Sequence, residues 1–146
     1  MKPHNTVFSG EHVVEAGLIV AYGDATIIAS KNATVILFDR AVAHISDTVH
    51  CTARDEATVH AHGSAEVVLG NGAFLWAYDQ ASFIANDDST VWAYGQSEGY
   101  LFGRAAFHGH DQASALSTST SEPRLHHQAV VEKLTPQGVQ VIKSQG

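Results

Sequence analysis

A pattern of eight residues repeats from Gly17 to Thr120 without an insertion or deletion, and no other feature constrains the fold as strongly. Three of its copies are Ala25-Thr-Ile-Ile-Ala-Ser-Lys-Asn, Ala57-Thr-Val-His-Ala-His-Gly-Ser and Ser89-Thr-Val-Trp-Ala-Tyr-Gly-Gln. The first position of each octad is nearly always Ala, the third is usually aliphatic or Phe, and the seventh is usually Asp, Gly or Asn. Self-similarity at a short fixed period indicates a solenoid, in which each unit packs only on its neighbours.

Each octad is expected to form a short strand and a corner. Successive side chains of a strand point to opposite faces, so positions one, three and five share the buried face, and positions two, four and six face outward. Asp, Gly and Asn at position seven favour a turn because they tolerate a left-handed backbone. We therefore predict about five residues of strand and about three of corner in each octad.

The outward positions indicate how many octads make one coil. Residues stacked one coil apart lie about 4.8 Å from each other and tend to be alike. Position four of alternate octads separates into a His and Trp set and a mostly aliphatic set, whereas grouping every third octad leaves mixed rows. The sequence therefore predicts an all-β fold, a right-handed parallel β-solenoid with two octads per coil, the hand following the strong default for parallel crossovers. A triangular coil of three octads is the alternative.

The ends of the chain depart from the octad pattern. Residues 1–16 fit it poorly and are predicted to be an N-terminal cap over the open end of the solenoid, which spans residues 17–120. Residues 121–146 are expected to form a link and a C-terminal cap. Thr135-Pro-Gln-Gly suits a turn between two apolar segments, so a terminal hairpin is the first prediction, and a short helix over His127 to Leu134 is the second.

Composition narrows the classes of function. The formal net charge is −7, and residues 17–120 hold eleven acidic and four basic residues, with most of the acids at the corners. Direct nucleic-acid binding needs a basic stripe, which the sequence lacks. No apolar run is long enough to cross a membrane and the N-terminus has no signal-peptide core, so we expect a cytoplasmic protein without membrane contact. The single Cys51 falls at an inward position, which is typical of a buried thiol in a reducing compartment.

One outward face is distinguished by its rings. Its eighteen outward positions, taken from alternate octads between Thr26 and His110, contain no Asp, Glu, Lys or Arg. The candidate binding residues on it are His44, His60, His62, Trp76, Tyr78, Trp92, Tyr94, His108 and His110. A soluble protein seldom leaves so much aromatic surface uncovered. Two interpretations stay open: ladders that stabilise the stack, or a binding face that uses rigid aromatic area.

Metal binding and catalysis have less support. His44, His60 and His62 place three imidazoles on one face, a ligand type that suits zinc, copper or nickel, but no carboxylate or Cys accompanies them there. The corner aspartates are similar to those of calcium-binding nonapeptide solenoids, but the paired glycines of that class are missing. No Ser/His/Asp set, phosphate-binding loop or paired-carboxylate motif stands out. We therefore expect no cofactor and no enzymatic activity.

The octads of the form Ala-Thr-Val-x-Ala-x-Asp/Gly-x between Gly17 and Thr120 resemble the short alanine-rich β-helix repeats of bacterial and phage proteins. The resemblance implies the solenoid architecture and carries no catalytic residue across.

We expect a non-enzymatic binding or assembly module that contacts another protein or a second copy of itself through the His/Trp/Tyr face. An outward aliphatic row that includes Ile36, Val68 and Ile84 favours self-association. One alternative is a carbohydrate-binding module that stacks sugars on Trp76 and Trp92. Another is an acidic decoy of a nucleic-acid-binding protein.

Overall fold

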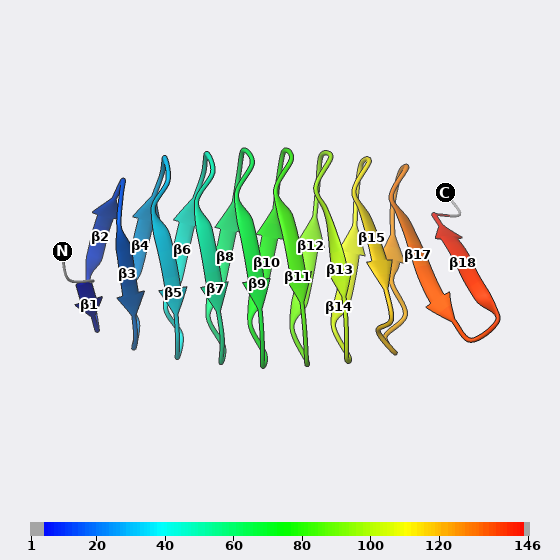
Figure 1. The fold of residues 1–146 in the computed structure, drawn as a ribbon, viewed down its shortest axis with the longest axis horizontal. Helices are drawn as coiled ribbons and strands as arrows, with labels where there is room; N and C mark the ends of the chain where they lie inside the picture. Colours follow the sequence, from blue (N-terminus) through cyan, green and yellow to red (C-terminus); the bar gives the residue numbers. More distant parts are fainter. Residues whose placement is uncertain (1–4, 145–146) are drawn as a thin grey trace.

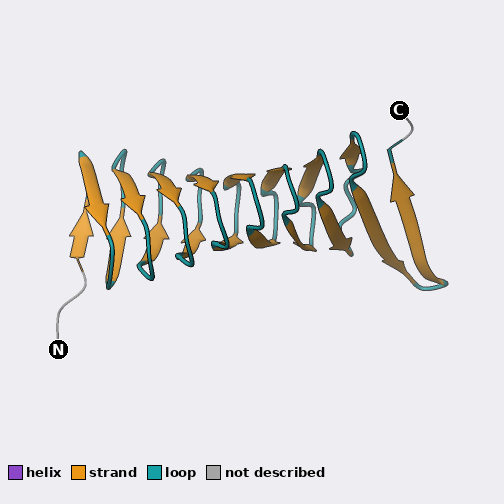
Figure 2. Cartoon of the chain, turned by 90° about the horizontal axis from the view of Figure 1, so that it is seen from above, coloured by secondary structure: helices purple, strands orange, loops and turns teal. Residues whose placement is uncertain are grey.

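The computed structural model describes residues 5–144, which form two β-sheets, here called sheet A and sheet B, that lie over one another (Figures 1 and 2). The strands of sheet A, in spatial order, are β1 (Asn5–Val7), β3 (Leu18–Ala21), β5 (Thr34–Leu37), β7 (His50–Ala53), β9 (Glu66–Leu69), β11 (Ser82–Ala85), β13 (Glu98–Leu101), β15 (Ser114–Ser117), β17 (Val130–Thr135) and β18 (Gly138–Lys143). Those of sheet B are β2 (Glu11–Val14), β4 (Thr26–Ala29), β6 (Val42–Ile45), β8 (Thr58–Ala61), β10 (Phe74–Ala77), β12 (Thr90–Ala93), β14 (Ala106–Gly109) and β16 (Arg124–Leu125). From β1 to β17 the chain therefore alternates between the two sheets, and residues 5–144 contain no helix.

The strands pair in parallel at a register offset of 16 residues through most of the rod. Trp76 of β10 lies opposite Trp92 of β12, and Ile84 of β11 lies opposite Tyr100 of β13. One coil thus contains two octads, which confirms the predicted two-sided coil, and the triangular alternative is wrong. The coil winds right-handed through about eight turns (Figure 1). Figure 2 shows that the strands turn progressively along the rod, as the twist of β-sheets requires.

The alternation of the octad determines the core. In β4, Ile27 and Ala29 are buried between the sheets, whereas Thr26 and Ile28 face outward. Ala at position one is small enough to let the two sheets approach each other near the corners. Cys51 is buried in the same core, as predicted, and burial raises the pKa of its thiol. The regular strands are four residues long, one residue shorter than expected.

Position seven of the octad adopts a left-handed backbone at most corners. The φ angles of Asp39 and Asp79 are both 57°, and that of Gly63 is 64°. Asp, Asn and Gly accept this conformation at the smallest steric cost, which is the reason for their recurrence. Lys31 adopts φ 61° without that preference, so the geometry of the coil imposes the conformation on it.

Aspartates at position seven also join neighbouring coils. Oδ2 of Asp39 accepts a hydrogen bond from the backbone N–H of Gly23 at 2.9 Å, and Oδ2 of Asp79 accepts one from Gly63 at 3.0 Å. Six aspartates within residues 5–144 make this bond to the corner one coil earlier. The corner acids therefore satisfy backbone donors, in addition to giving the rod its negative charge.

The solenoid extends beyond both boundaries drawn from the sequence. β1 and β2 pair in parallel with β3 and β4 at offsets of 14 and 15 residues, so residues 5–14, expected as a cap, form a shortened first coil. This shortening conceals the octad frame before Gly17. At the other end His108 lies opposite Arg124 and Ser114 opposite Val130, so the offset of 16 continues past Thr120.

The C-terminal segment forms a hairpin. β17 pairs with β15 in parallel and with β18 in antiparallel fashion, and the turn between β17 and β18 is Thr135-Pro-Gln-Gly. This confirms the predicted hairpin, and the alternative helix over His127 to Leu134 is wrong. β18 thereby becomes the last strand of sheet A, at the C-terminal end of the rod (Figure 1).

Two glycines make room for the largest rings of the core. Phe83 of β11 and Phe107 of β14 are buried, with ring centroids 5.9 Å apart. A Cβ on Gly99 would clash with the backbone oxygen and the ring of Phe83, and a Cβ on Gly109 would clash with the ring of Phe107. Each large ring therefore fills the space that a side chain on the neighbouring glycine would occupy, and the interior stays close-packed.

Candidate functional site

Sheet B carries two columns of stacked rings on its outer face. Parallel pairing at a constant offset places the same strand position of successive coils side by side, so outward rings stack along the rod. The first column contains His44, His60, Trp76, Trp92 and His108, and the second contains His62, Tyr78, Tyr94, His110 and His126. We call these two columns the ring ladder.

Neighbouring rings of the ladder are nearly parallel and in contact. Centroid distances run from 4.4 to 5.2 Å in the first column and from 4.5 to 5.2 Å in the second, and no interplanar angle exceeds 16°. All nine candidate residues from the sequence lie in the ladder. His126 is a tenth member that the sequence analysis missed, because it ended the octad frame at Thr120. Continuing the frame by one octad places His126 at position six, next to His110.

Stacking covers the faces of the rings and leaves their edges open. Trp76 lies between His60, at 5.1 Å, and Trp92, at 4.4 Å, while Trp92 has His108 on its other side at 5.2 Å. Both indoles are half-buried. The ladder therefore presents a strip of ring edges that includes indole N–H, phenol O–H and imidazole nitrogen atoms.

Ionic groups lie only at the margins of this face. No Asp, Glu, Lys or Arg occupies an outward position between Thr26 and His110 on the strands β4 to β14 of sheet B. Arg124 is in register with His108 at the C-terminal end of the ladder. Asp79 lies at a corner, where its Oδ2 is 3.9 Å from Nδ1 of His62. A partner can therefore cover the centre of the ladder without desolvating a fixed charge.

The crowding of imidazoles opposes their protonation. Desolvation lowers the pKa of His60, and repulsion from His44 and His62 lowers it further. The pKa of His108 is lowered by desolvation first and then by the neighbouring charges of Arg124 and other histidines. Desolvation likewise lowers the pKa of His110, with repulsion from His126 adding to the effect. The lowered pKa values favour the neutral forms of His60, His108 and His110.

The three histidines considered as metal ligands do not converge on a point. His44 and His60 stack face to face at 4.8 Å with 9° between their planes, and His62 stacks on Tyr78 instead. Within residues 5–144, no group of three or more His, Cys, Asp and Glu side chains is arranged to hold a metal ion. These imidazoles serve as stacking partners in the ladder.

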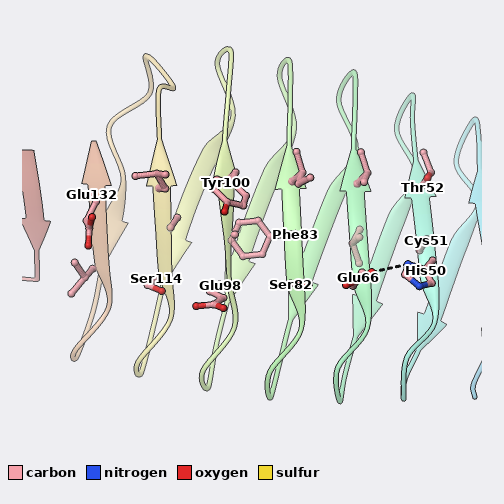
Figure 3. A pocket seen from close by; sticks show the side chains of 17 residues that line it. His50, Cys51, Thr52, Glu66, Ser82, Phe83, Glu98, Tyr100, Ser114 and Glu132 are labelled. Atoms are coloured by element: carbon pink, nitrogen blue, oxygen red, sulfur yellow. Dashed lines mark ion pairs between the residues drawn. The ribbon is translucent and has the colours of Figure 1, made fainter. Parts of the chain in front are cut away.

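A groove of about 590 Å³ runs along the outer face of sheet A, on the other side of the rod (Figure 3). Its apolar lining comes from Val68, Ile84, Tyr100 and Leu116. Its acidic lining comes from Glu66, Glu98 and Glu132, and Oε2 of Glu66 is 2.8 Å from Nδ1 of His50. The octad pattern shows the aliphatic row but not the groove, because the hollow depends on the shape of the whole sheet.

Most of the exposed large apolar side chains lie on sheet A. Eight of them lie on or next to its strands. Phe8, at 66%, directly follows β1, and the other seven lie between β9 and β18 with exposed fractions of 38 to 57%: Val68, Ile84, Tyr100, Phe102, Leu134, Val139 and Val141. We call these seven residues the aliphatic face. Sheet B contributes only Val13 and Ile28 to the exposed large apolar side chains of the described chain, and no Trp or Tyr of the ring ladder is among them.

No protein-family model, curated protein or solved structure matches this chain. The resemblance to alanine-rich β-helix repeats therefore stays a prediction. Across residues 5–144, no helix has the length and apolar character that crossing a membrane requires. The ring ladder and the aliphatic face are therefore the features of the molecule that bear on its function.

Proposed function

We propose that this chain is a non-enzymatic binding or assembly module that contacts another protein, or a second copy of itself, through the ring ladder. The observation that carries the proposal is the continuity of the ladder, in which ten stacked rings follow one another beside outward positions that hold no ionic side chain between Thr26 and His110. The centres of protein interfaces are poor in charge and rich in Trp and Tyr, because these side chains bury much area around a polar group. The ladder has this composition.

The rigidity of the ladder supports the same proposal. Most of its rings are held between two neighbours; Tyr94, for example, lies between Tyr78 at 5.2 Å and His110 at 4.7 Å. A side chain that is already ordered loses little conformational entropy when a partner covers it. The ring edges supply hydrogen-bonding groups at fixed spacing, which gives a flat partner surface both area and orientation.

Carbohydrate binding is the alternative, and the stacking geometry gives it less support. A sugar that stacks on an aromatic side chain needs a free ring face, whereas neighbouring rings cover both faces of Trp76 and Trp92. Sugar recognition would depend on hydrogen bonds to ring edges instead. Glycan retention on an array that disappears in the Trp76→Ala and Trp92→Ala variants would favour this alternative over protein contact.

A decoy role for the acidic rod also has less support. Six corner aspartates already accept backbone hydrogen bonds from the preceding coil, so they are fixed by the fold and spread over both edges of the rod. A decoy would capture a basic partner through long-range attraction. Its capture would therefore weaken steeply with added salt, whereas contact through an uncharged ladder would not.

The test of ladder binding places charge beside the ladder without removing a ring. Thr58 of β8 and Thr90 of β12 are half-buried outward residues of sheet B, and Thr34 of β5 occupies the same octad position in sheet A. We expect Thr58→Lys and Thr90→Lys to lower retention of partner proteins on the immobilised chain by about tenfold or more, because each buries an unpaired charge. Thr34→Lys is the matched control and should retain them. Equal retention by all three variants, in quantitative mass spectrometry, would overturn the proposal.

A further inference from the structure

The four sheet edges of residues 5–144 are protected to very different degrees. β1 has three residues, β2 begins with Glu11, and β16 has two residues and directly follows Pro123. Short length, charge and proline are the means by which native proteins stop an edge strand from pairing with another chain. β18 has six residues, and none of them is charged before Lys143. Only this edge is long, regular and free of such protection.

The side chains of β18 add to the exposure of this edge. Val139 and Val141 point to the outer face and are 57% and 53% exposed. They lie opposite Leu134 and Glu132 of β17, so Leu134 and the two valines form an apolar cluster beside the open edge. Among the described residues β18 has a strand neighbour on one side only, and its other side is the C-terminal limit of sheet A (Figure 1).

We infer that β18 is a dimerisation edge, which pairs in antiparallel fashion with β18 of a second copy of this chain. A two-fold axis perpendicular to the sheet keeps the outer faces of both copies on one side and joins their two sheets A into one continuous sheet. With the axis at Gln140, Val139 of each copy lies opposite Val141 of the other. Val–Val pairs across neighbouring strands are favourable. In this register Lys143 lies opposite Gln137, so no like charges face each other.

This contact closes as a dimer. An isologous interface uses the same surface on both copies and leaves no further β18 edge open. Growth into a fibre would need head-to-tail pairing of β18 with β1, which offers only three residues. The two rods therefore join tail to tail, with their N-terminal coils at the outer ends. The inference concerns a surface separate from the ring ladder and does not rest on the proposed function.

Light scattering after size exclusion tests the inference on the full chain. We expect a particle of about twice the chain mass of 15.6 kDa at tens of micromolar, and a monomer when Val139→Lys and Val141→Lys are combined. Val13→Lys is the matched control, because Val13 is 70% exposed on the edge strand β2 at the other end, and it should stay dimeric. Circular dichroism checks that each variant keeps its strands. A monomeric natural chain, or a dimer that survives the double substitution, would overturn the inference.

Cysteine crosslinking tests the register in a Cys51→Ala background. Gln140→Cys alone should give a disulfide-linked dimer under mild oxidation, because Gln140 lies on the two-fold axis. Val139→Cys and Val141→Cys should crosslink when mixed and not when separate. Crosslinking of Val141→Cys with itself would contradict the Gln140-centred register. The Thr58→Lys variant should remain a dimer. A monomeric Thr58→Lys variant would show that the two copies contact each other through the ring ladder and not through β18.

Discussion

The ring ladder of sheet B and the aliphatic face of sheet A have the same coil spacing, yet they expose apolar surface very differently. A planar ring fits the spacing of about 4.8 Å between paired strands, so each ring covers the face of the next. Val68, Ile84 and Tyr100 of sheet A leave 39 to 48% of their surface exposed. The shape of the outward side chain, rather than the number of apolar residues, thus decides whether a face of this solenoid covers itself.

The two faces therefore have different roles: the ring ladder joins neighbouring coils, and the aliphatic face exposes apolar area. The ladder holds coils together, because every ring contacts the coil before or after it, and it offers a partner only ring edges. The aliphatic face contributes no ring stacking between coils, since its two rings, Tyr100 and Phe102, follow one another within the same coil. It offers more uncovered apolar area, which continues onto the hairpin next to the open edge of β18.

The largest effect is expected beneath the aliphatic face, at Gly99. Gly99→Val places a branched side chain against the backbone and ring of Phe83, and such overpacking should lower the free energy of unfolding by about 3 kcal/mol or more. Gly72→Ala is the matched control, because its Cβ would meet only the oxygen of Asp55 at an ordinary 3.5 Å. Urea denaturation measures both. A Gly99→Val variant as stable as Gly72→Ala would show that the core of sheet A can rearrange.

Much of this architecture follows from the octad alone. The period predicts the solenoid, the alternation predicts the core, and the likeness of rows such as Trp76 and Trp92 predicts two octads per coil. The sequence did not reveal that Asp39 bonds to the coil before it, or that Gly99 is matched to Phe83. Each of these contacts joins two residues that are 16 apart and of different types. A comparison that looks for similar residues at equivalent positions of successive coils does not detect such complementary pairs.

The sequence predicted the solenoid to begin at Gly17 and end at Thr120, and both limits were wrong, for two different physical reasons. The first coil is shorter by one or two residues, so the frame disappears although β1 and β2 still pair with β3 and β4. In the last coil the spacing is unchanged, but Pro123 and Arg124 fill positions that are mostly aliphatic or aromatic elsewhere. At this end the spacing of 16 residues locates the last coil correctly, whereas the change in residue types at Pro123 and Arg124 falsely suggests that the repeat has ended.

The next largest effect compares the stability that one ring contributes on each of the two faces. Trp92→Ala removes a ring with stacked neighbours on both sides and should lower the free energy of unfolding by about 2 kcal/mol, since each aromatic pair contributes about 0.5–1.5 kcal/mol. Tyr100→Ala removes a ring that is 48% exposed and should cost about 1 kcal/mol or less. Trp92→Phe should recover much of the first loss. Equal costs for the two alanine variants, in urea denaturation, would remove the distinction between the faces.

A smaller effect is expected from acid, and three histidines of the ladder should contribute to it. His60, His108 and His110 have folded-state pKa values below their unfolded values, so their neutral forms are favoured by folding. The unfolded chain therefore binds more protons as the pH falls below about 6.5, and stability decreases through that window until the folded-state pKa values are passed.

We expect a thermal midpoint that is lower by a few degrees at pH 5 than at pH 7.5. His108→Phe keeps a ring in the stack but removes one titrating group, so its midpoint should fall less over the same range. A midpoint that does not change with pH, in both the natural chain and the variant, would show that the imidazoles of the ladder protonate without cost.

The smallest effect on stability is expected at the outer row of the aliphatic face. Val68→Thr and Ile84→Thr keep a β-branched residue at outward strand positions, so the free energy of unfolding should change by no more than about 0.5 kcal/mol. Their effect should appear instead in the fluorescence of an apolar dye, because together they remove uncovered apolar area along the groove. Trp92→Ala should do the reverse, with a clear loss of stability and more dye binding as neighbouring ring faces open. If the threonine variants lost stability and the ladder variant did not, the aliphatic face would be the one that holds the coils together, and the ring ladder would be free to bind.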